Sequence, residues 1–597
     1  MPEKIPAQAG RIGLRIFARW VQWLLALALS QLALAVLAEQ PNIVVVLVDD
    51  AGLMDFSGFG GEAQTPNIDA LSEAGMSFSN YRTSPMCAPT RAMLLTGLTS
   101  HKAGVGALSE IMTPEQQQSP AYSQRLLPGV KTVATRLRAG GYQTFVAGKW
   151  HLGHEPGDLP NEHGFDRSFV LDASGADNYE QKSFMPFYAD APWFEDGLPT
   201  ALPDGFYSSE FLVSQMIKYL DGRDPDRPFL VYLPFLAIHI PVQAPREYTD
   251  KYTGVYHEGW DAIRLSRVKR AKALGLVPAG AEVPNIPPSL RKWDALSPES
   301  QAHYERRMMV NAGMLDAMDH HLGRLIDYLK SNGAYDNTVF VITSDNGPEF
   351  GEPNLDANFR SWMPRNGYND DFDTLGEKGS NIAIGAEWAS AAAGPSHLFK
   401  TFASEGGMRV PLIISGPGVF SERFNDARVY VTDLAPTLSE LAGVPSGDVD
   451  GRSLVPLLRR EAEYVYEADD PVGFELGGNS ALYKGQFKLV RNTLPFGDAE
   501  WRLYDIVADP SETNDLSAVH PDVKAELLKD YERFASENGV IALPKDYDPY
   551  QQLRRNASGR IFKRNLPQLV GYGVLLLGAL AFISLVALRL RSRRALS

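Results

Sequence analysis

The fold class is decided by the stretch Asn42-Ile43-Val44-Val45-Val46-Leu47-Val48-Asp49-Asp50. Its unbroken run of β-branched and apolar residues is typical of a strand buried on both faces of a parallel sheet. The run ends in two carboxylates. Because ligands of open α/β sheets bind at the carboxyl ends of the strands, Asp49 and Asp50 are candidates for a site there.

Helical and strand signals alternate after this stretch. Thr65 and Pro66 offer an N-cap and a first helical residue, and Gly75 offers a stop. A second helix is expected at 130–139, and further strands are expected at 142–147, 229–233 and 339–343. The alternation predicts an α/β fold with a large, mostly parallel sheet flanked by helices.

A helix with one apolar face precedes the last of these strands. Its apolar residues recur at three- and four-residue steps, which predicts core packing, and they are Leu315, Met318, Leu322, Leu325 and Leu329. The adjacent pair His320-His321 is assigned to the helix surface.

The pattern changes twice after residue 350. Residues 351–399 show little periodicity and are expected to form a long insertion. From about residue 460 the segments shorten, and an amphipathic helix follows around Val523 to Phe534. This part predicts a smaller antiparallel sheet with one helix.

Both ends of the chain carry membrane-targeting signals. Basic residues followed by the apolar stretch 21–38 predict a signal peptide or an uncleaved signal anchor. Near the other end, 569–588 is free of charge and long enough to cross a bilayer as a helix. The chain is therefore divided into six parts: the N-terminal signal (1–38), the main domain (39–459), a C-terminal subdomain (460–550), a basic juxtamembrane segment (551–568), the transmembrane helix (569–588) and a basic tail (589–597).

Charge flanks the predicted transmembrane helix on both sides, so the positive-inside rule alone does not orient it. The N-terminal signal sets the orientation, because it would export the part of the chain that lies between it and the transmembrane helix. We expect a body on the periplasmic or extracellular face, anchored by its C-terminal helix, with a short cytoplasmic tail.

The exported part is strongly acidic. The chain has a net charge of −15, but 1–38 carries +3 and 551–597 carries +9, so the part between them carries −27. Such a body repels polyanions, which excludes nucleic acid as an expected partner and requires a local cluster of cations for any anionic substrate. The single cysteine, Cys87, cannot form an intramolecular disulfide, so it serves either packing or chemistry.

Cys87 begins the segment Cys87-Ala88-Pro89-Thr90-Arg91, just before a predicted helix that ends near Gly97. Amide groups at a helix N-terminus favour an anion, and Arg91 adds a fixed positive charge there.

Oxygen-bearing side chains also end a second strand, at Asp345-Asn346. If the two acidic pairs converge at one sheet edge, their oxygens suit a hard cation, Ca²⁺ before Mg²⁺. Taken singly, such acids more often form turns. Lys149, His151, His239 and Lys400 would each be ordinary core or surface residues if they stood alone.

Together these pieces resemble a known family. Cys87-Ala88-Pro89-Thr90-Arg91 resembles the Cys-x-Pro-Ser/Thr-Arg signature of type I sulfatases, of the alkaline phosphatase superfamily. Other segments resemble family elements in the same order, over nearly all of 42–540: Asp49-Asp50, Gly148-Lys149-Trp150-His151-Leu152-Gly153, His239-Ile240-Pro241, Ser344-Asp345-Asn346-Gly347, Lys400 with Glu405-Gly406-Gly407-Met408-Arg409-Val410-Pro411, and Asp509-Pro510-Ser511-Glu512-Thr513.

The resemblance implies an arylsulfatase-like enzyme whose catalytic domain is 39–459. It implies that a maturation enzyme oxidises Cys87 to formylglycine, whose hydrate attacks sulfur to give a covalent sulfoenzyme and then releases sulfate and an alcohol or phenol. The implied substrate is a sulfated small molecule or saccharide. The implied metal ligands are Asp49, Asp50, Cys87 as formylglycine, Asp345 and Asn346.

The resemblance also implies roles for the remaining residues. His239 with Lys400 would protonate or stabilise the departing oxygen, and His151 would take a proton during sulfate release. Lys149 and Arg91 would hold the hydrate and the cation.

Two alternatives remain at this stage. One is a phosphonate monoester or phosphodiester hydrolase of the same superfamily, and the other is an inactive, membrane-tethered binding protein on a sulfatase-like scaffold.

Overall fold

A ten-stranded mixed sheet forms the centre of the molecule, and the computed structural model describes residues 40–284 and 286–594. The predicted N-terminal signal at 1–38 lies outside the described residues. The decisive stretch forms β1 (Asn42–Val48), which pairs in parallel with β8 (Phe229–Pro234) and β9 (Thr338–Ser344). The parallel centre continues through β4 (Gln143–Lys149) and β5 (Arg167–Leu171).

Antiparallel pairs appear on both sides of this centre, and β11 at one edge pairs in parallel with β2. β10 runs against both β9 and β2, while β6 and β7 complete the other side in antiparallel pairing. The remaining strands are β2 (Met76–Phe78), β6 (Trp193–Glu195), β7 (Leu198–Thr200), β10 (Leu412–Ser415) and β11 (Glu422–Asn425), with β3 (Tyr81–Arg82) and β12 (Val429–Tyr430) paired separately. The predicted α/β sheet is thus confirmed, with parallel strands at its centre.

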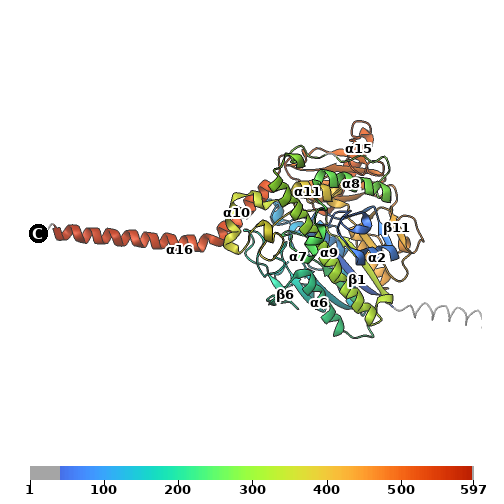
Figure 1. Ribbon diagram of the computed structural model, residues 1–597, viewed down its shortest axis with the longest axis horizontal. Coiled ribbons are helices and arrows are strands. Elements are labelled where there is room, and N and C mark those ends of the chain that lie inside the picture. Colours follow the sequence, from blue (N-terminus) through green and yellow to red (C-terminus); the bar gives the residue numbers. More distant parts are fainter. Residues whose placement is uncertain (1–39, 285, 595–597) are drawn as a thin grey trace, which may run out of the picture. The chain divides into compact units, whose positions relative to one another are not determined.

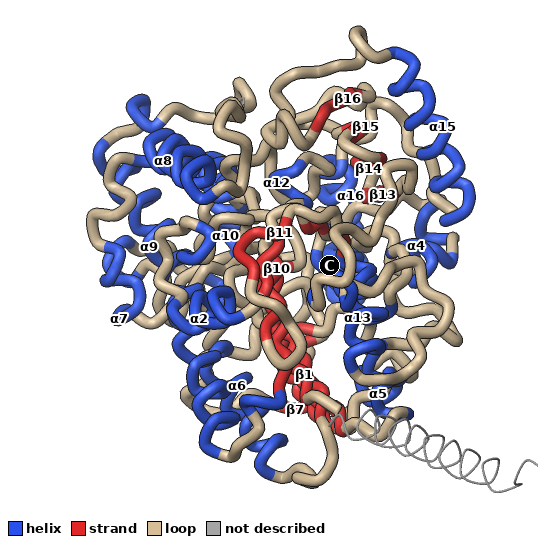
Figure 2. The backbone as a smooth tube through the Cα atoms, turned by 90° about the vertical axis from the view of Figure 1, so that its right-hand side faces the viewer, coloured by secondary structure: helices blue, strands red, loops and turns tan. Residues whose placement is uncertain are grey.

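Helices cover both faces of this sheet, and Figures 1 and 2 show the strands between them. Val44, Val46 and Val48 pack on one side and Ile43, Val45 and Leu47 on the other, as a doubly buried strand requires. One face carries α2 (Pro66–Ala74), α6 (Ser208–Asp221), α8 (Gly259–Leu274) and α9 (Pro298–Ser331). The other carries α3 (Cys87–Thr96), α4 (Ser100–Ala103), α5 (Val133–Ala139), α13 (Leu434–Leu441) and α14 (Val455–Leu458).

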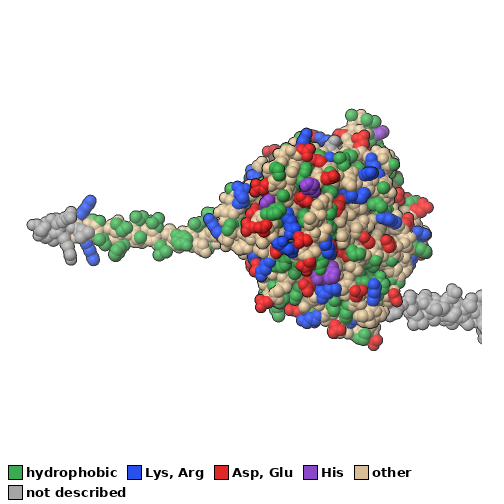
Figure 3. All heavy atoms as spheres, in the orientation of Figure 1, with side chains coloured by type: hydrophobic (Ala, Val, Ile, Leu, Met, Phe, Trp, Pro, Cys, Tyr) green, Lys and Arg blue, Asp and Glu red, His purple; other side chains and the backbone are tan. Residues whose placement is uncertain are grey.

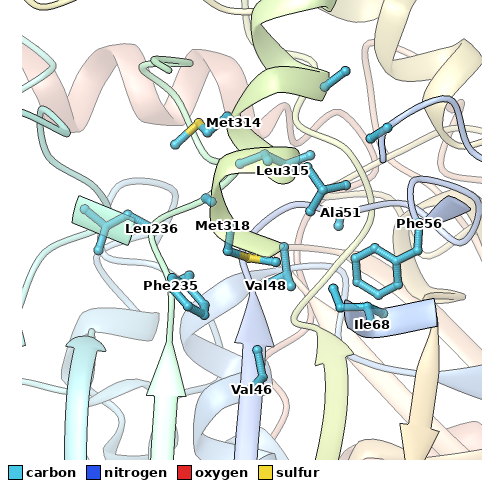
Figure 4. Close-up of a cluster of buried hydrophobic side chains, with 14 of the residues drawn as sticks. Val46, Val48, Ala51, Phe56, Ile68, Phe235, Leu236, Met314, Leu315 and Met318 are labelled. Carbon is cyan, nitrogen blue, oxygen red and sulfur yellow. The ribbon is translucent and has the colours of Figure 1, made fainter. Parts of the chain in front are cut away.

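The apolar face of α9 forms much of the core beneath β1. Figure 4 shows Met314, Leu315 and Met318 from α9 over Val46 and Val48 from β1. The predicted stripe is buried along its whole length.

The assignment of His321 to the helix surface is wrong, because this side chain is only 7% exposed while His320 is exposed. The ring of Tyr207, just before α6, and that of Tyr248, in α7 (Arg246–Thr249), pack against His321. Two adjacent histidines on a helix point in different directions, so one can be buried while the other is not.

A second, four-stranded sheet is antiparallel, as predicted. Its strands follow chain order, and α15 (Pro521–Asn538) packs on it through Leu527 and Tyr531. The strands are β13 (Val472–Leu476), β14 (Asn479–Lys484), β15 (Phe487–Arg491) and β16 (Arg502–Asp505). The region 351–399 contains α10 (Ala357–Trp362) and α11 (Gly385–Ala392), and α12 (Glu405–Met408) follows it.

The C-terminal segments form a single helix, α16 (Pro549–Arg594). Among the described residues, it is the one helix long and apolar enough to cross a membrane. Side chains at 569–588 are exposed, and Figure 3 shows the apolar surface that they form.

Candidate active site

The two acidic pairs meet at the carboxyl ends of β1 and β9. These strands are parallel neighbours with Val48 opposite Ser344, so the residues that follow each strand lie side by side. The Asp50 amide donates to Asp345 Oδ1 (3.2 Å), and Asn346 Nδ2 donates to Asp50 Oδ1 (2.7 Å). The convergence expected from the sequence is present.

Cys87 is the first residue of α3 and is fully buried beside these pairs. Its Sγ lies 3.6 Å from His151 Nδ1. Ligand atoms of Asp49, Cys87 and Asp345 all lie within 4.8 Å of one another. Burial raises the pKa of the thiol to about 11, so the unmodified side chain is a neutral thiol at pH 7 and a weak nucleophile.

Arg91 and Lys149 both form ion pairs with Asp49, and Arg91 also pairs with Asp345. Arg91 Nη2 lies 2.7 Å from Asp345 Oδ2 and 3.3 Å from Asp49 Oδ2. Lys149 Nζ lies 2.5 Å from Asp49 Oδ2. Burial opposes the ionisation of Asp49, but the neighbouring cations outweigh it and hold the pKa of Asp49 below its usual range.

Lys400 forms ion pairs with Asp50 and with Glu349, and the sequence did not predict Glu349 as part of the site. Its Nζ lies 2.7 Å from Asp50 Oδ1 and 3.0 Å from Glu349 Oε2. Glu349 comes three residues after Asn346, and that short spacing was the available signal. Even with Lys400 adjacent, burial raises the pKa of Asp50 to about 8. A further cation at the site would favour its ionised form.

The two histidines are neutral in these surroundings. Burial, reinforced by Lys149, lowers the pKa of both His151 and His239 well below the ordinary value. His239 Nδ1 lies 2.6 Å from the carbonyl oxygen of Ile240, so Nδ1 carries the proton and Nε2 faces Asp50 Oδ2 at 3.9 Å.

Two orphaned oxygens indicate room for a cation. Asp49 Oδ1 and Asn346 Oδ1 are buried and have no hydrogen-bond partner within the described part of the chain. A buried acceptor without a partner costs about 1–3 kcal/mol. Carboxylate and amide oxygens are the ligands of hard cations, so the residues present fit such an ion.

These contacts join all ten residues singled out in the sequence, which are Asp49, Asp50, Cys87, Arg91, Lys149, His151, His239, Asp345, Asn346 and Lys400. Cavities open on two sides of them. One of about 510 Å³ is lined by His239 and Lys400, and another of about 470 Å³ by His151.

Two of the matched segments build an interface rather than the site. Glu405 is fully buried and pairs with Arg82 and with Lys488, each at 2.9 Å. Lys488 also lies 2.7 Å from Glu512. The small sheet is thus tied to α12 and β3 of the main body through buried ion pairs.

Comparisons with known proteins agree with this geometry. The sequence profile of the sulfatase family matches residues 41–444, and the profile described as N-sulphoglucosamine sulphohydrolase, C-terminal, matches 396–535. An uncharacterized sulfatase of Schizosaccharomyces pombe is 35% identical over 533 residues, which cover 85% of this chain and 96% of the relative. The arylsulfatase of Klebsiella aerogenes is 35% identical over 431 residues, covering 70% and 90%.

Among solved structures, Ps i-CgsB in complex with k-i-k-neocarrahexaose has the same fold, with a TM-score of 0.60 at 23% identity over 88% of this chain and 100% of that one. The family profile covers more than half of the chain, and the resemblance inferred from the motifs is confirmed. The chain belongs to the sulfatase family and is a sulfuric ester hydrolase.

Proposed function

We propose that the chain hydrolyses sulfate monoesters of small molecules or saccharides with a formylglycine made from Cys87. As a hydrate, that group supplies one hydroxyl to attack sulfur, giving a covalent sulfoenzyme, and a second to release sulfate. The observation that carries the proposal is the position of Cys87, 3.6 Å from His151 and among the ligand atoms of Asp49 and Asp345. A buried, protonated thiol would not itself serve as the nucleophile.

The proposed metal is Ca²⁺, with Mg²⁺ less favoured, held by Asp49, Asp50, Asp345 and Asn346 together with the oxidised Cys87. Such an ion polarises sulfate oxygens. The orphaned oxygens of Asp49 and Asn346 support its presence.

Three cations would bind the sulfate group in an otherwise acidic body. Arg91, Lys149 and Lys400 lie around the acidic pairs and are all buried. Positive charge fixed in a dry site stabilises the negative charge that moves onto the departing oxygen.

His239 and Lys400 would protonate or stabilise the departing oxygen. Both line the cavity of about 510 Å³, which is where the alcohol part of the ester would lie. His151, on the side of the other cavity, would take the proton from the second hydroxyl during sulfate release.

A variant of Cys87 tests this proposal. In Cys87→Ala, hydrolysis of 4-nitrophenyl sulfate should fall by roughly 10⁴-fold or more, with unchanged circular dichroism. A variant that keeps wild-type turnover would overturn the assignment. Matched aryl sulfate and aryl phosphonate esters test the specificity, and sulfate should have the higher kcat/KM.

We propose further that α16 anchors the enzyme in a membrane, with the body exported and the tail cytoplasmic. Exposed apolar side chains over 569–588 form a surface too large to leave in water, which supports this. Besides the membrane, a second partner would be the formylglycine-generating enzyme that oxidises Cys87. Protease added to cells freed of any outer membrane should digest the body and spare a tag on the C-terminus, and the reverse result would contradict this orientation.

A further inference from the structure

The cavity beside His239 and Lys400 is lined mainly by apolar side chains. They come from separate parts of the chain and include Met86, Ile111, Phe184, Met185, Phe187 and Phe359. Most of the residues that line the neighbouring cavity beside His151 are polar or charged, and they include Gln124, Arg125, Asp158 and Asp172. The groups proposed to act on the departing oxygen therefore face a lining that is mostly apolar and that also carries the carboxyl groups of Glu110, Glu349, Glu352 and Asp356.

One wall of the apolar cavity is the beginning of α16. Leu553, Ala557 and Ile561 line it at intervals of four residues, so they lie on one face of the helix. All three are half-buried. Figure 1 shows α16 leaving the body beside α10, which contributes Phe359 to the same cavity.

The body holds this part of α16 by hydrogen bonds. Asn556 Nδ2 donates to the carbonyl oxygens of Glu110 (3.0 Å) and Met112 (2.9 Å). Arg560 Nη1 lies 2.9 Å from Glu110 Oε1, and Arg564 Nη2 donates to the Pro186 carbonyl at 2.8 Å. The helix is therefore a fixed wall of the cavity.

The same helix continues into the apolar stretch. Leu569 lies eight positions after Ile561, which is about 12 Å along a helix. Lys563, with an exposed side chain, lies between them, and Arg554, also exposed, lines the cavity. Basic side chains close to a membrane-spanning stretch attract anionic amphiphiles at the bilayer surface.

We infer that the enzyme acts on the sulfate ester of a membrane-resident amphiphile, whose apolar alcohol part reaches the cavity from the bilayer that holds α16. This inference rests on the proposed function, including the membrane anchor. The ester R–O–SO₃⁻ reacts with water to give R–OH and hydrogen sulfate. The bond between sulfur and the ester oxygen breaks, and the departing oxygen receives a proton on the side of His239 and Lys400.

The test uses the full-length protein reconstituted in phosphatidylcholine vesicles with three esters. Hexadecyl sulfate resides in the same vesicles, while butyl sulfate and 4-nitrophenyl sulfate are soluble. The two alkyl esters share one kind of leaving group, so the ratio of their turnover rates reflects only the length of the alkyl chain. Hexadecyl sulfate should release sulfate at least about tenfold faster than butyl sulfate at equal total concentration, because enzyme and substrate share one surface.

Ala557→Trp tests the wall itself, since the larger ring would fill the cavity. It should lower the ratio of hexadecyl to butyl sulfate turnover by about tenfold or more. Arg555→Trp is the matched control, because Arg555 is exposed and does not line this cavity, and it should keep the wild-type ratio. If Ala557→Trp does not fold, Ile561→Gln replaces it and should lower the same ratio.

Failure of this inference is distinct from failure of the proposed function. Hydrolysis of 4-nitrophenyl sulfate with equal or faster turnover of butyl sulfate would overturn the membrane substrate alone, as would an unchanged ratio in both wall variants. Absence of sulfate release from all three esters would overturn the proposed function with it.

Discussion

His239 Nε2 lies 3.9 Å from Asp50 Oδ2, on the side of the site where Lys400 contacts the same carboxylate at 2.7 Å. This relationship places an imidazole nitrogen and an ammonium group together in the lining of the apolar cavity, where both residues are buried. It places a neutral imidazole, whose Nε2 carries no proton, beside the Lys400 ammonium on the side where the alcohol of the proposed ester would depart.

The first prediction concerns the leaving group. His239→Gln should slow hydrolysis of butyl sulfate by about 10²–10⁴-fold and that of 4-nitrophenyl sulfate far less, because a nitrophenolate departs without a proton. Comparison of kcat/KM for the two esters measures this difference. The control is His257→Gln, at a side chain that is 81% exposed. Equal losses on both esters would contradict a role in protonation.

The second prediction concerns the metal. Chelation with EDTA should abolish turnover, and added Ca²⁺ should restore it. Ca²⁺ at 100 times its Kd should also raise the free energy of unfolding by about 2.7 kcal/mol, measured as a rise in Tm. Asp345→Asn should lose this rise, whereas Asp546→Asn, at an exposed position, should keep it. Full activity after exhaustive chelation would exclude a metal at the acidic pairs.

The third prediction concerns the interface between the small sheet and α12. Lys488→Met leaves Glu405 and Glu512 buried without their shared cation, so it should lower the free energy of unfolding by about 3–5 kcal/mol. Lys545→Met removes an ion pair that is largely exposed and should cost less than about 1 kcal/mol. Chemical denaturation of the detergent-solubilised protein measures both. Similar small losses would show that the network contributes little.

The fourth prediction concerns pH. Burial lowers the pKa of His321 to about 4, against an ordinary value near 6.5. Between these values the unfolded chain binds a proton here that the folded chain does not, so acidification destabilises the fold. The stabilising contribution is complete above pH 6.5 and declines as the pH falls towards 4.

Replacing this side chain should therefore flatten the pH dependence. Between pH 7 and pH 4.5, the free energy of unfolding of His321→Gln should fall by about 2 kcal/mol less than that of the wild type. His320→Gln, at the exposed neighbour, should behave as the wild type does. Unfolding midpoints at the two pH values provide the measurement, and parallel losses in His321→Gln would contradict it.

Much of the fold could be predicted because β1 carries two kinds of information. Its unbroken apolar run indicates burial on both faces, and its terminal aspartates mark the ligand-binding edge of a parallel sheet. Since Asp345 follows a neighbouring parallel strand, the convergence of the pairs follows from topology.

Other features depend on contacts that leave no local pattern. Asn556 reaches the Met112 carbonyl across 444 residues, so the sequence gives no sign that the C-terminal helix forms a wall of the cavity. Glu349 follows Asn346 closely in the sequence, but only its contact with Lys400 shows that it belongs to the site. His321 is buried by tyrosines from other parts of the chain, which helical periodicity alone does not reveal.

The state of Cys87 in the active protein tests the central proposal most directly. Trypsin should cut after Arg82 and Arg91, releasing Thr83–Arg91 with Cys87 inside it. Mass spectrometry of this peptide, from a preparation with measured turnover, should find an aldehyde in place of the thiol. A quantitatively intact thiol in a fully active preparation would contradict the account.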